Sequence, residues 1–184
     1  MRILCNASAL IAIFIAGLAG HVANADDLHE IDCASSSFEF TDQAYDIDCE
    51  RAETQTHVGT SSGSVRLDVI TISSRERSLF LTMTSQVITA PRIYLEHRSL
   101  SQSFSNMFGQ EDVREWNGVG NKNGYDVAEF KTDISGNESS CIAVQRYSNP
   151  AWTGYKRHVV GMGCAVAGLE PIYELLVKLS APGD

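Results

Sequence analysis

The sequence predicts an α+β fold, in which a single domain contains an antiparallel sheet of about five strands, two amphipathic helices packed on one face of it, and two disulfides. Three observations lead to this prediction. Short runs of alternating apolar and polar residues are separated by turn formers. Two stretches repeat apolar residues at helical spacing. Four of the five cysteines lie beyond the apolar N-terminal segment, and the length of 184 residues suits one domain.

Residues 1–25 are predicted to be a signal peptide. Arg2 supplies a positive charge, residues 3–18 are almost wholly apolar, and Ala23-Asn24-Ala25 matches the cleavage pattern of such peptides. The apolar run of about 16 residues contains Asn6 and is shorter than the roughly 20 residues that span a bilayer. We therefore expect residues 26–184 to form an exported domain, periplasmic or secreted, without a transmembrane segment after cleavage.

The four remaining cysteines predict two disulfides, because an even number of cysteines in an exported domain is typical of cross-linking. Residues 140–147 and 156–166 alternate like strands, with turn formers between them. If these strands are antiparallel neighbours with Cys141 opposite Cys164, the next opposed pairs are 143 with 162, 145 with 160, and 147 with 158. Opposed residues lie close enough for a disulfide. The predicted pairs are Cys33–Cys49 and Cys141–Cys164. The alternative, a zinc site, lacks the usual C-x-x-C spacing.

The first part of the chain is predicted to contain one clear hairpin. Residues 26–37 are a polar lead-in, and residues 38–49 form a short hairpin or an irregular segment tied by its disulfide. Residues 53–64 are rich in Ser, Thr and Gly and are predicted to be a polar loop. Residues 65–72 and 79–84 alternate on either side of a polar turn, which predicts two paired strands.

Two helices are predicted from proline starts and apolar stripes. The first begins at Pro91 and ends before Gly109. One side of it carries Ile93, His97, Leu100, Phe104 and Phe108. The second begins at Pro171, and its stripe is Ile172, Leu175, Leu176 and Leu179. Because each helix has one apolar side, we expect both to pack on the same face of the sheet.

Between the helices, a loop and a strand are predicted. Residues 117–124 are mostly glycine and asparagine and favour a loop. Residues 125–132 alternate like a strand, and a turn at 135–138 leads into the strand that carries Cys141.

The charge and the motifs exclude several classes of function. Asp and Glu number 23 against 14 Lys and Arg, and the net charge of −9 argues against nucleic acid, since no basic stripe is present. Charge alone would not hold the chain on an anionic membrane. The glycines of 118–124 lack the G-x-G-x-x-G spacing, and the acidic residues around Cys49 lack the calcium-loop pattern. We therefore predict no cofactor and no metal.

Residues 59–63 match G-x-S-x-G, the pattern that places a nucleophilic serine on a strand-to-helix turn in hydrolases. A small serine hydrolase would use Ser61 with His97 or His158 as its base. The context disfavours this hypothesis, because a polar stretch precedes Ser61 and a strand follows it. His97, on the apolar side of the first predicted helix, is interpreted as a hydrogen-bonded core residue, with an acid–base role as the alternative.

The loop 149–155 carries the residues that we favour for binding. Trp152 and Tyr155 stand on this loop, whose base the Cys141–Cys164 bridge is expected to fix. Aromatic side chains on a rigid loop are typical interface anchors. The alternative for Trp152 is that it folds back onto the sheet as part of the core.

Three further aromatic or basic residues are candidates for the same surface. In the predicted register His158 faces Tyr147, and Trp116 lies beside the second glycine-rich loop. Without a catalytic constellation, the sequence favours an exported, non-enzymatic binding module for a protein or a component of the cell envelope. An inhibitor of an exported enzyme is one version. A structural or assembly role, in which one face of the sheet pairs with another chain, is the remaining hypothesis.

Overall fold

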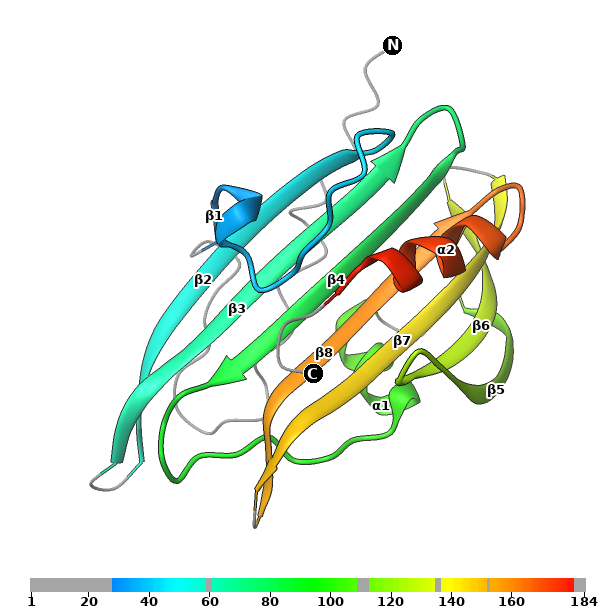
Figure 1. Ribbon diagram of the computed structural model, residues 1–184. Coiled ribbons are helices and arrows are strands. Elements are labelled where there is room, and N and C mark those ends of the chain that lie inside the picture. The colour runs from blue at the N-terminus through cyan, green and yellow to red at the C-terminus, as the bar shows by residue number, and fades with distance from the viewer. Residues whose placement is uncertain (1–27, 59–60, 109–112, 135–136, 152, 181–184) are drawn as a thin grey trace.

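The computed structural model describes residues 28–58, 61–108, 113–134, 137–151 and 153–180. In this part of the chain the protein is mostly β, with one antiparallel sheet of eight strands in the order β1-β2-β3-β4-β8-β7-β6-β5 (Figure 1). The prediction of an α+β fold with about five strands is therefore wrong. The strands are β1 (His29–Glu30), β2 (Asp46–Val58), β3 (Ser61–Ser74), β4 (Leu79–Ile88), β5 (Arg114–Lys122), β6 (Tyr125–Ile134), β7 (Asn137–Ala151) and β8 (Gly154–Ala165). The helices are a 3-10 turn η3 (Cys33–Ser35), α1 (Leu100–Phe108) and α2 (Glu170–Lys178).

The cysteine hairpin has the register that the sequence predicts. Cys141 pairs with Cys164 across β7 and β8, and the pairs 143 with 162, 145 with 160 and 147 with 158 follow. Both predicted disulfides are present, with Cα–Cα distances of 5.3 Å for Cys33–Cys49 and 4.1 Å for Cys141–Cys164. The hairpin of residues 65–72 and 79–84 is confirmed in β3 and β4, and the strand of residues 125–132 lies within β6.

Three segments that the sequence predicts as loops are strands. The pairing of β2 with β3 continues to Val58 opposite Ser61, so the polar loop of residues 53–64 is wrong. Strands that extend beyond a core need no apolar alternation, because the register is set by their buried parts. The loop between the two cysteine strands is also shorter than predicted, because β7 continues to Ala151 and β8 begins at Gly154. Residues 117–122 belong to β5.

The turn from β5 to β6 explains the last of these errors. Lys122 pairs with Tyr125, which leaves Asn123 and Gly124 as a two-residue turn. Their φ angles of 53° and 77° are both positive, and Asn-Gly is the preferred pair for such a hairpin turn. The Asn-Gly pair, and not the glycine content of the whole stretch, indicates where the chain turns.

The first predicted helix is wrong in its first half. Residues 91–99 are not helical: residues 91 and 92 form a turn, and Leu95 forms a β-bridge with Tyr155. The helix α1 begins only after Ser99, whose Oγ accepts from the Gln102 amide at 3.3 Å while Gln102 Oε1 accepts from the Ser99 amide at 3.0 Å. This reciprocal pair is a capping box, a stronger start signal than Pro91. The second predicted helix is confirmed as α2, with Pro171 in its first turn.

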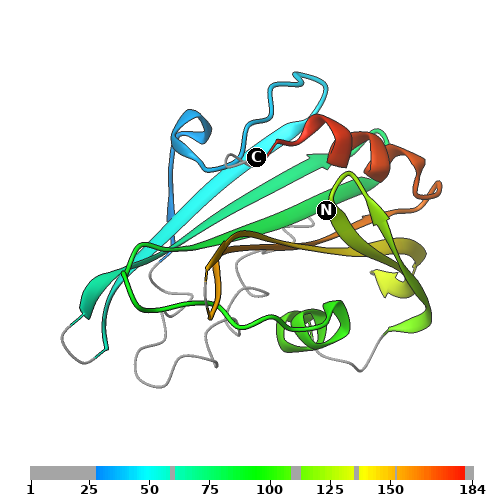
Figure 2. The same cartoon turned by 60° about the horizontal axis from the view of Figure 1, so that its bottom comes forward.

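The two helices cover opposite faces of the sheet, so the prediction that they share one face is wrong (Figure 2). Leu100 and Phe104 of α1 pack with Cys141, while α2 packs in the same cluster as Ile142, the next residue along β7. The central strands are therefore buried on both sides. We call these sides the α1 face and the α2 face.

One glycine lets α2 come close to the sheet. A Cβ at Gly163 of β8 would lie 2.6 Å from Cγ2 of Ile172, a fully buried residue of α2. A side chain at this position would push the helix outward. Neither α1 nor α2, the two α-helices of the described residues, is long and apolar enough to cross a membrane.

Candidate functional site

Four rings gather on one end of the β7–β8 hairpin, and we call them the aromatic cluster: His97, Tyr147, Tyr155 and His158. Tyr147 and His158 are opposed across the two strands, and their rings stack with centroids 4.2 Å apart and planes at 8°. The ring of Tyr147 also lies 4.9 Å from that of Tyr155 and 4.9 Å from that of His97. The sequence predicted the contact of Tyr147 with His158, but not that His97 would join it.

The segment of residues 91–99, before α1, fixes this cluster. Leu95 and Tyr155 exchange two backbone hydrogen bonds, of 2.8 Å and 3.0 Å. The Arg98 amide donates to Tyr147 Oη at 3.1 Å. His97 therefore lies in a segment without helix or strand and is exposed, so the prediction that it stands on the apolar side of a helix is wrong. This segment therefore holds the backbone of Tyr155 and the hydroxyl of Tyr147 by hydrogen bonds.

Lys156 ties the same segment to β8 at its other end. Its Nζ donates to the backbone oxygens of Ala90 and of Ile93, the latter at 2.6 Å. The ammonium also lies 4.0 Å from the centre of the Tyr94 ring, a cation–π contact. Burial lowers the pKa of Lys156. Its role is structural, because its donors are directed at the backbone of this chain rather than at solvent.

His158 is a buried and uncharged member of the cluster. Its side chain is 6% exposed, and no described residue makes a hydrogen bond to its Nε2. Burial, together with the charge of Arg98 and the nearby His97, lowers the pKa of His158 to about 4. The imidazole is therefore neutral near pH 7, so it can stack on Tyr147 without the desolvation penalty of a buried cation.

We expect the stability of the protein to fall as the pH is lowered from 7 to 4 because of His158. An unfolded histidine binds its proton near pH 6.5, whereas folded His158 binds it only near pH 4. Between these values the unfolded state binds more protons, and the free energy of unfolding should fall by about 3 kcal/mol. Urea unfolding at pH 7 and pH 4 measures the loss, and His158→Phe should show a loss smaller by that amount. Equal losses in the two proteins would contradict the prediction.

The sequence also predicts Trp152 and Trp116 for binding. Trp152 lies outside the described residues. Trp116 of β5 packs near α1, with its ring 5.4 Å from that of Phe104 and 5.8 Å from that of Phe130. Its partners are core aromatics, so the structure gives Trp116 a packing role at a different place on the α1 face.

The structure does not bring Ser61 to His158. Ser61 begins β3 opposite Val58, and strand continues from it with no helix. His158 is opposed to Gln86, which is opposed to Leu67 of β3. Six residues of strand separate Ser61 from that level, about 20 Å along β3. In hydrolases the nucleophilic serine stands on a turn between a strand and a helix. The described residues that follow Ser61 form no such turn.

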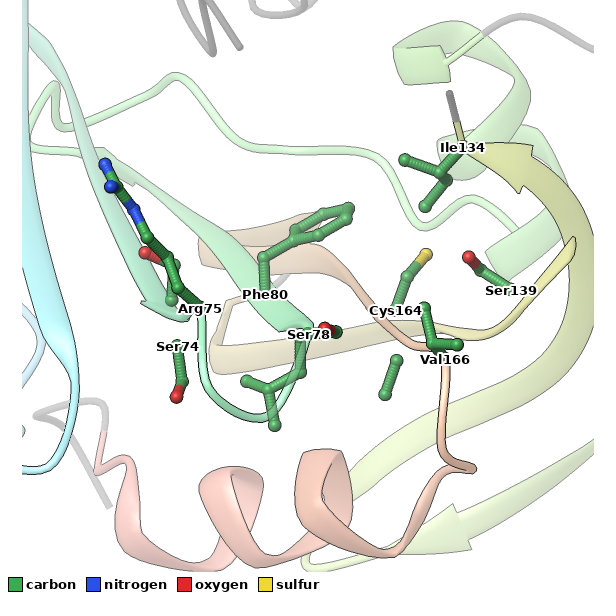
Figure 3. A pocket seen from close by; sticks show the side chains of 11 residues that line it. Ser74, Arg75, Ser78, Phe80, Ile134, Ser139, Cys164 and Val166 are labelled. Carbon is green, nitrogen blue, oxygen red and sulfur yellow. The ribbon is translucent and has the colours of Figure 1, made fainter. Parts of the chain in front are cut away.

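A small pocket lies at the opposite end of the sheet, beside the Cys141–Cys164 bridge (Figure 3). Its volume is about 330 Å³, and the residues around it include Phe80, Ile134, Ser139 and Cys164. Among the described residues that line it, Arg75 is the one side chain that carries a charge. The pocket offers no acid–base pair, and the described residues contain no group of His, Cys, Asp and Glu that could hold a metal ion.

Comparison of this chain with protein-family models, curated proteins and solved structures finds no match.

Proposed function

We propose that the protein is an exported, non-enzymatic binding module that recognises a protein or an envelope component through the aromatic cluster. The observation that carries this proposal is the pair of partly exposed tyrosine rings, Tyr147 and Tyr155, with centroids 4.9 Å apart at the end of a hairpin. Tyrosine offers a large apolar surface and one polar atom, a combination that is enriched at interfaces.

Preorganisation supports the proposal. The backbone of Tyr155 is paired with Leu95, and the hydroxyl of Tyr147 is held by the Arg98 amide. The disulfide Cys141–Cys164 links the same two strands farther along. A partner would therefore meet a Tyr147 ring and a Tyr155 backbone that are already held, which lowers the conformational entropy lost on association.

Two features support the proposed export. Disulfides persist in oxidising compartments and are rare in the cytosol of most organisms, and this chain contains two of them. The predicted signal peptide lies outside the described residues and supports export by its sequence alone.

We expect Tyr155→Ala to weaken capture of a partner by at least roughly tenfold, because central aromatic residues dominate interface energies. Oxidised residues 26–184 would serve as bait in envelope extract, and the affinity of the captured partner would then be measured by titration. Tyr173→Ala is the matched control, since Tyr173 is also partly buried but belongs to α2 on the opposite face. Circular dichroism would verify that both variants are folded. The proposal fails if both variants bind as wild type, or if the control loses binding equally.

A further inference from the structure

The pocket beside the Cys141–Cys164 bridge has mainly apolar walls. Its apolar lining comes from β4, β6, the end of β8 and the residue that follows β8, and includes Leu79, Phe80, Ile134, Ala165 and Val166. The polar groups around it are mostly serine hydroxyls, and none of the described lining residues carries a negative charge. Small-molecule sites have this character, a mostly apolar hollow with a few polar groups.

The one charged side chain among these residues does not enter the apolar part of the pocket. In Figure 3 the side chains of Phe80 and Ile134 point toward one another across the pocket, whereas that of Arg75 points away from both. Arg75 is exposed at the turn between β3 and β4, so its charge lies at the rim, in water. The interior between Phe80 and Ile134 therefore suits an uncharged molecule, because an ion would lose its hydration there without gaining a partner.

The pocket leaves apolar surface in contact with water. Phe80 and Ile134 are only partly buried, at the margin of the cluster beneath α1, and Val166 is 57% exposed. Among the described residues, the only other large apolar side chain that is exposed is Val177 of α2, which does not line the pocket. Covering the apolar surface around this hollow would be favourable, since it would remove that surface from water.

The walls of the pocket are held in place within the fold. The disulfide joins Cys164 to Cys141 of the neighbouring strand. The Val166 amide donates to the backbone oxygen of Ser78 at 3.3 Å, which ties the end of β8 to the turn between β3 and β4. The Ser78 amide in turn donates to the backbone oxygen of Arg75 at 3.3 Å. The pocket is therefore preformed, as small-molecule sites usually are.

The size of the pocket and its surroundings favour a small molecule over a protein. The volume of about 330 Å³ lies near the lower end of the range of about 300–1,000 Å³ for small-molecule sites. It is about twice that of a cavity that takes up benzene. A specific protein interface covers about 800 Å² on each partner. Around this pocket, Val166 is the one large apolar side chain of the described residues that is exposed, so a broad apolar surface for a protein is missing from that part of the chain.

We propose that this pocket binds a small, uncharged, apolar molecule of one or two rings, held between Phe80 and Ile134 and bordered by Val166. Burial of these three side chains by the ligand supplies the binding energy. The pocket lies at the opposite end of the sheet from the aromatic cluster, and this proposal does not depend on the proposed function.

Fluorescence titration of the oxidised protein with prodan tests the proposal. Prodan is an uncharged fluorophore built on the two rings of naphthalene, and its emission moves to shorter wavelength when it leaves water. We expect a saturable shift with one site per chain. Naphthalene should displace the probe at least roughly tenfold more effectively than naphthoate, which has the same rings and a negative charge that the pocket would have to desolvate.

A pair of valine variants locates the site. Val166→Asp should weaken prodan binding at least roughly tenfold, because the ligand would have to strip water from a carboxylate at the border of the pocket. Val177→Asp makes the same change at a residue that is 69% exposed and does not line the pocket, so it should bind as wild type. Both positions are exposed, and circular dichroism would verify that the variants are folded. Tyr155→Ala should also keep the affinity, which separates this site from the aromatic cluster.

Three results would overturn the proposal. The first is the absence of a saturable shift; if wild type also forms a dimer that Val166→Asp dissociates, the pocket belongs to a contact with a second copy of the chain. The second is binding that Val166→Asp leaves unchanged or that Val177→Asp weakens equally. The third is stronger displacement by naphthoate than by naphthalene, and loss of that preference in Arg75→Gln would assign the pocket to an anion.

Discussion

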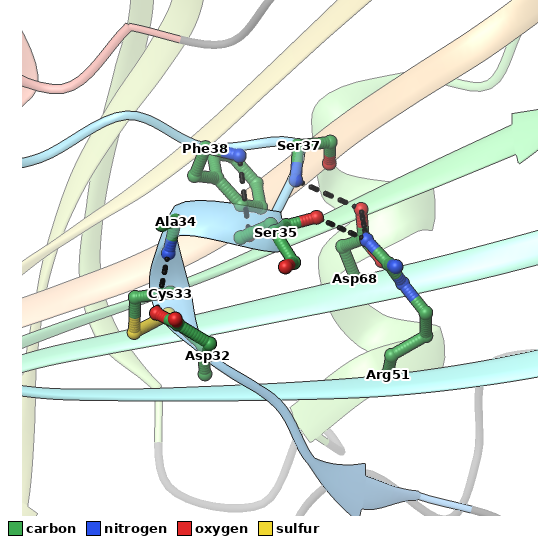
Figure 4. Close-up of a disulfide and its surroundings, with 10 residues drawn as sticks. Asp32, Cys33, Ala34, Ser35, Ser37, Phe38, Arg51 and Asp68 are labelled. Atoms are coloured by element: carbon green, nitrogen blue, oxygen red, sulfur yellow. Dashed lines mark hydrogen bonds and ion pairs between the residues drawn. A yellow bond between two sulfur atoms is a disulfide. The ribbon is translucent and has the colours of Figure 1, made fainter.

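Asp68→Ala is expected to lower the free energy of unfolding by about 3–5 kcal/mol, because it leaves the partly buried guanidinium of Arg51 without its counter-ion and a cavity where the carboxylate was buried. The Asp68 side chain is 0% exposed and binds Arg51 at 2.6 Å and the Ser37 amide at 2.9 Å (Figure 4). Removing the carboxylate leaves the Arg51 guanidinium and the Ser37 amide without their acceptor. Urea unfolding at pH 7 measures the difference between the variant and wild type.

A second aspartate–arginine pair supplies the control. Asp133 binds Arg114 at 3.0 Å, but the two side chains are 58% and 53% exposed. Water screens such a pair, and Asp133→Ala should change the free energy of unfolding by less than about 1 kcal/mol. The pairs share their chemistry and differ in burial. Similar losses in the two variants would show that burial does not set the strength of the Asp68 contacts.

Removing the disulfide of the β7–β8 hairpin should cost about 3 kcal/mol or more. Cys141 and Cys164 are 23 residues apart, and the bridge restricts the unfolded chain over that loop. Both cysteines are also buried in the cluster beneath α1, so the double variant Cys141→Ala/Cys164→Ala loses packing as well.

Urea unfolding of the oxidised proteins tests this value. The reference is the double variant that removes the bridge Cys33–Cys49, whose separation of 16 residues predicts a similar loss of chain restriction but whose Cys33 is only partly buried. We expect the larger loss at Cys141–Cys164. An unchanged unfolding midpoint in the Cys141→Ala/Cys164→Ala variant would contradict the prediction.

Local patterns in the sequence were sufficient for some elements of this fold. The register of Cys141 opposite Cys164 follows from alternation and from the distance that a disulfide can bridge. The helix α2 follows from Pro171 and a stripe of apolar residues. Both depend on residues near one another in the chain, where periodicity carries most of its information.

The parts that could not be predicted depend on strands that are distant in sequence. Asp68 stands between two apolar residues and has the pattern of a solvent-facing position, yet it is buried, and the Ser37 amide, 31 residues away in the chain, donates to its carboxylate. Arg66 and Arg157 are close only because β4 pairs with β8, and no local pattern encodes that pairing. Two local patterns do indicate the observed structure: the capping box of Ser99 and Gln102 marks a helix start, and Asn123-Gly124 marks a hairpin turn. The predictions instead followed Pro91 and the glycine content of residues 117–124.

The strand order has a consequence for how the chain acquires its structure. Strands β1 to β4 form one meander and β5 to β8 another, and in the sheet of the described residues the two are paired through β4 and β8. Each meander can assemble from hairpins between strands that are neighbours in sequence. Pairing β4 with β8 closes a much longer stretch of chain, so it costs more conformational entropy. Cys33–Cys49 lies in the first half and Cys141–Cys164 in the second, so each bridge stays within one half. Oxidation can therefore be completed within each half before the halves meet, and neither of these two disulfides cross-links β4 to β8.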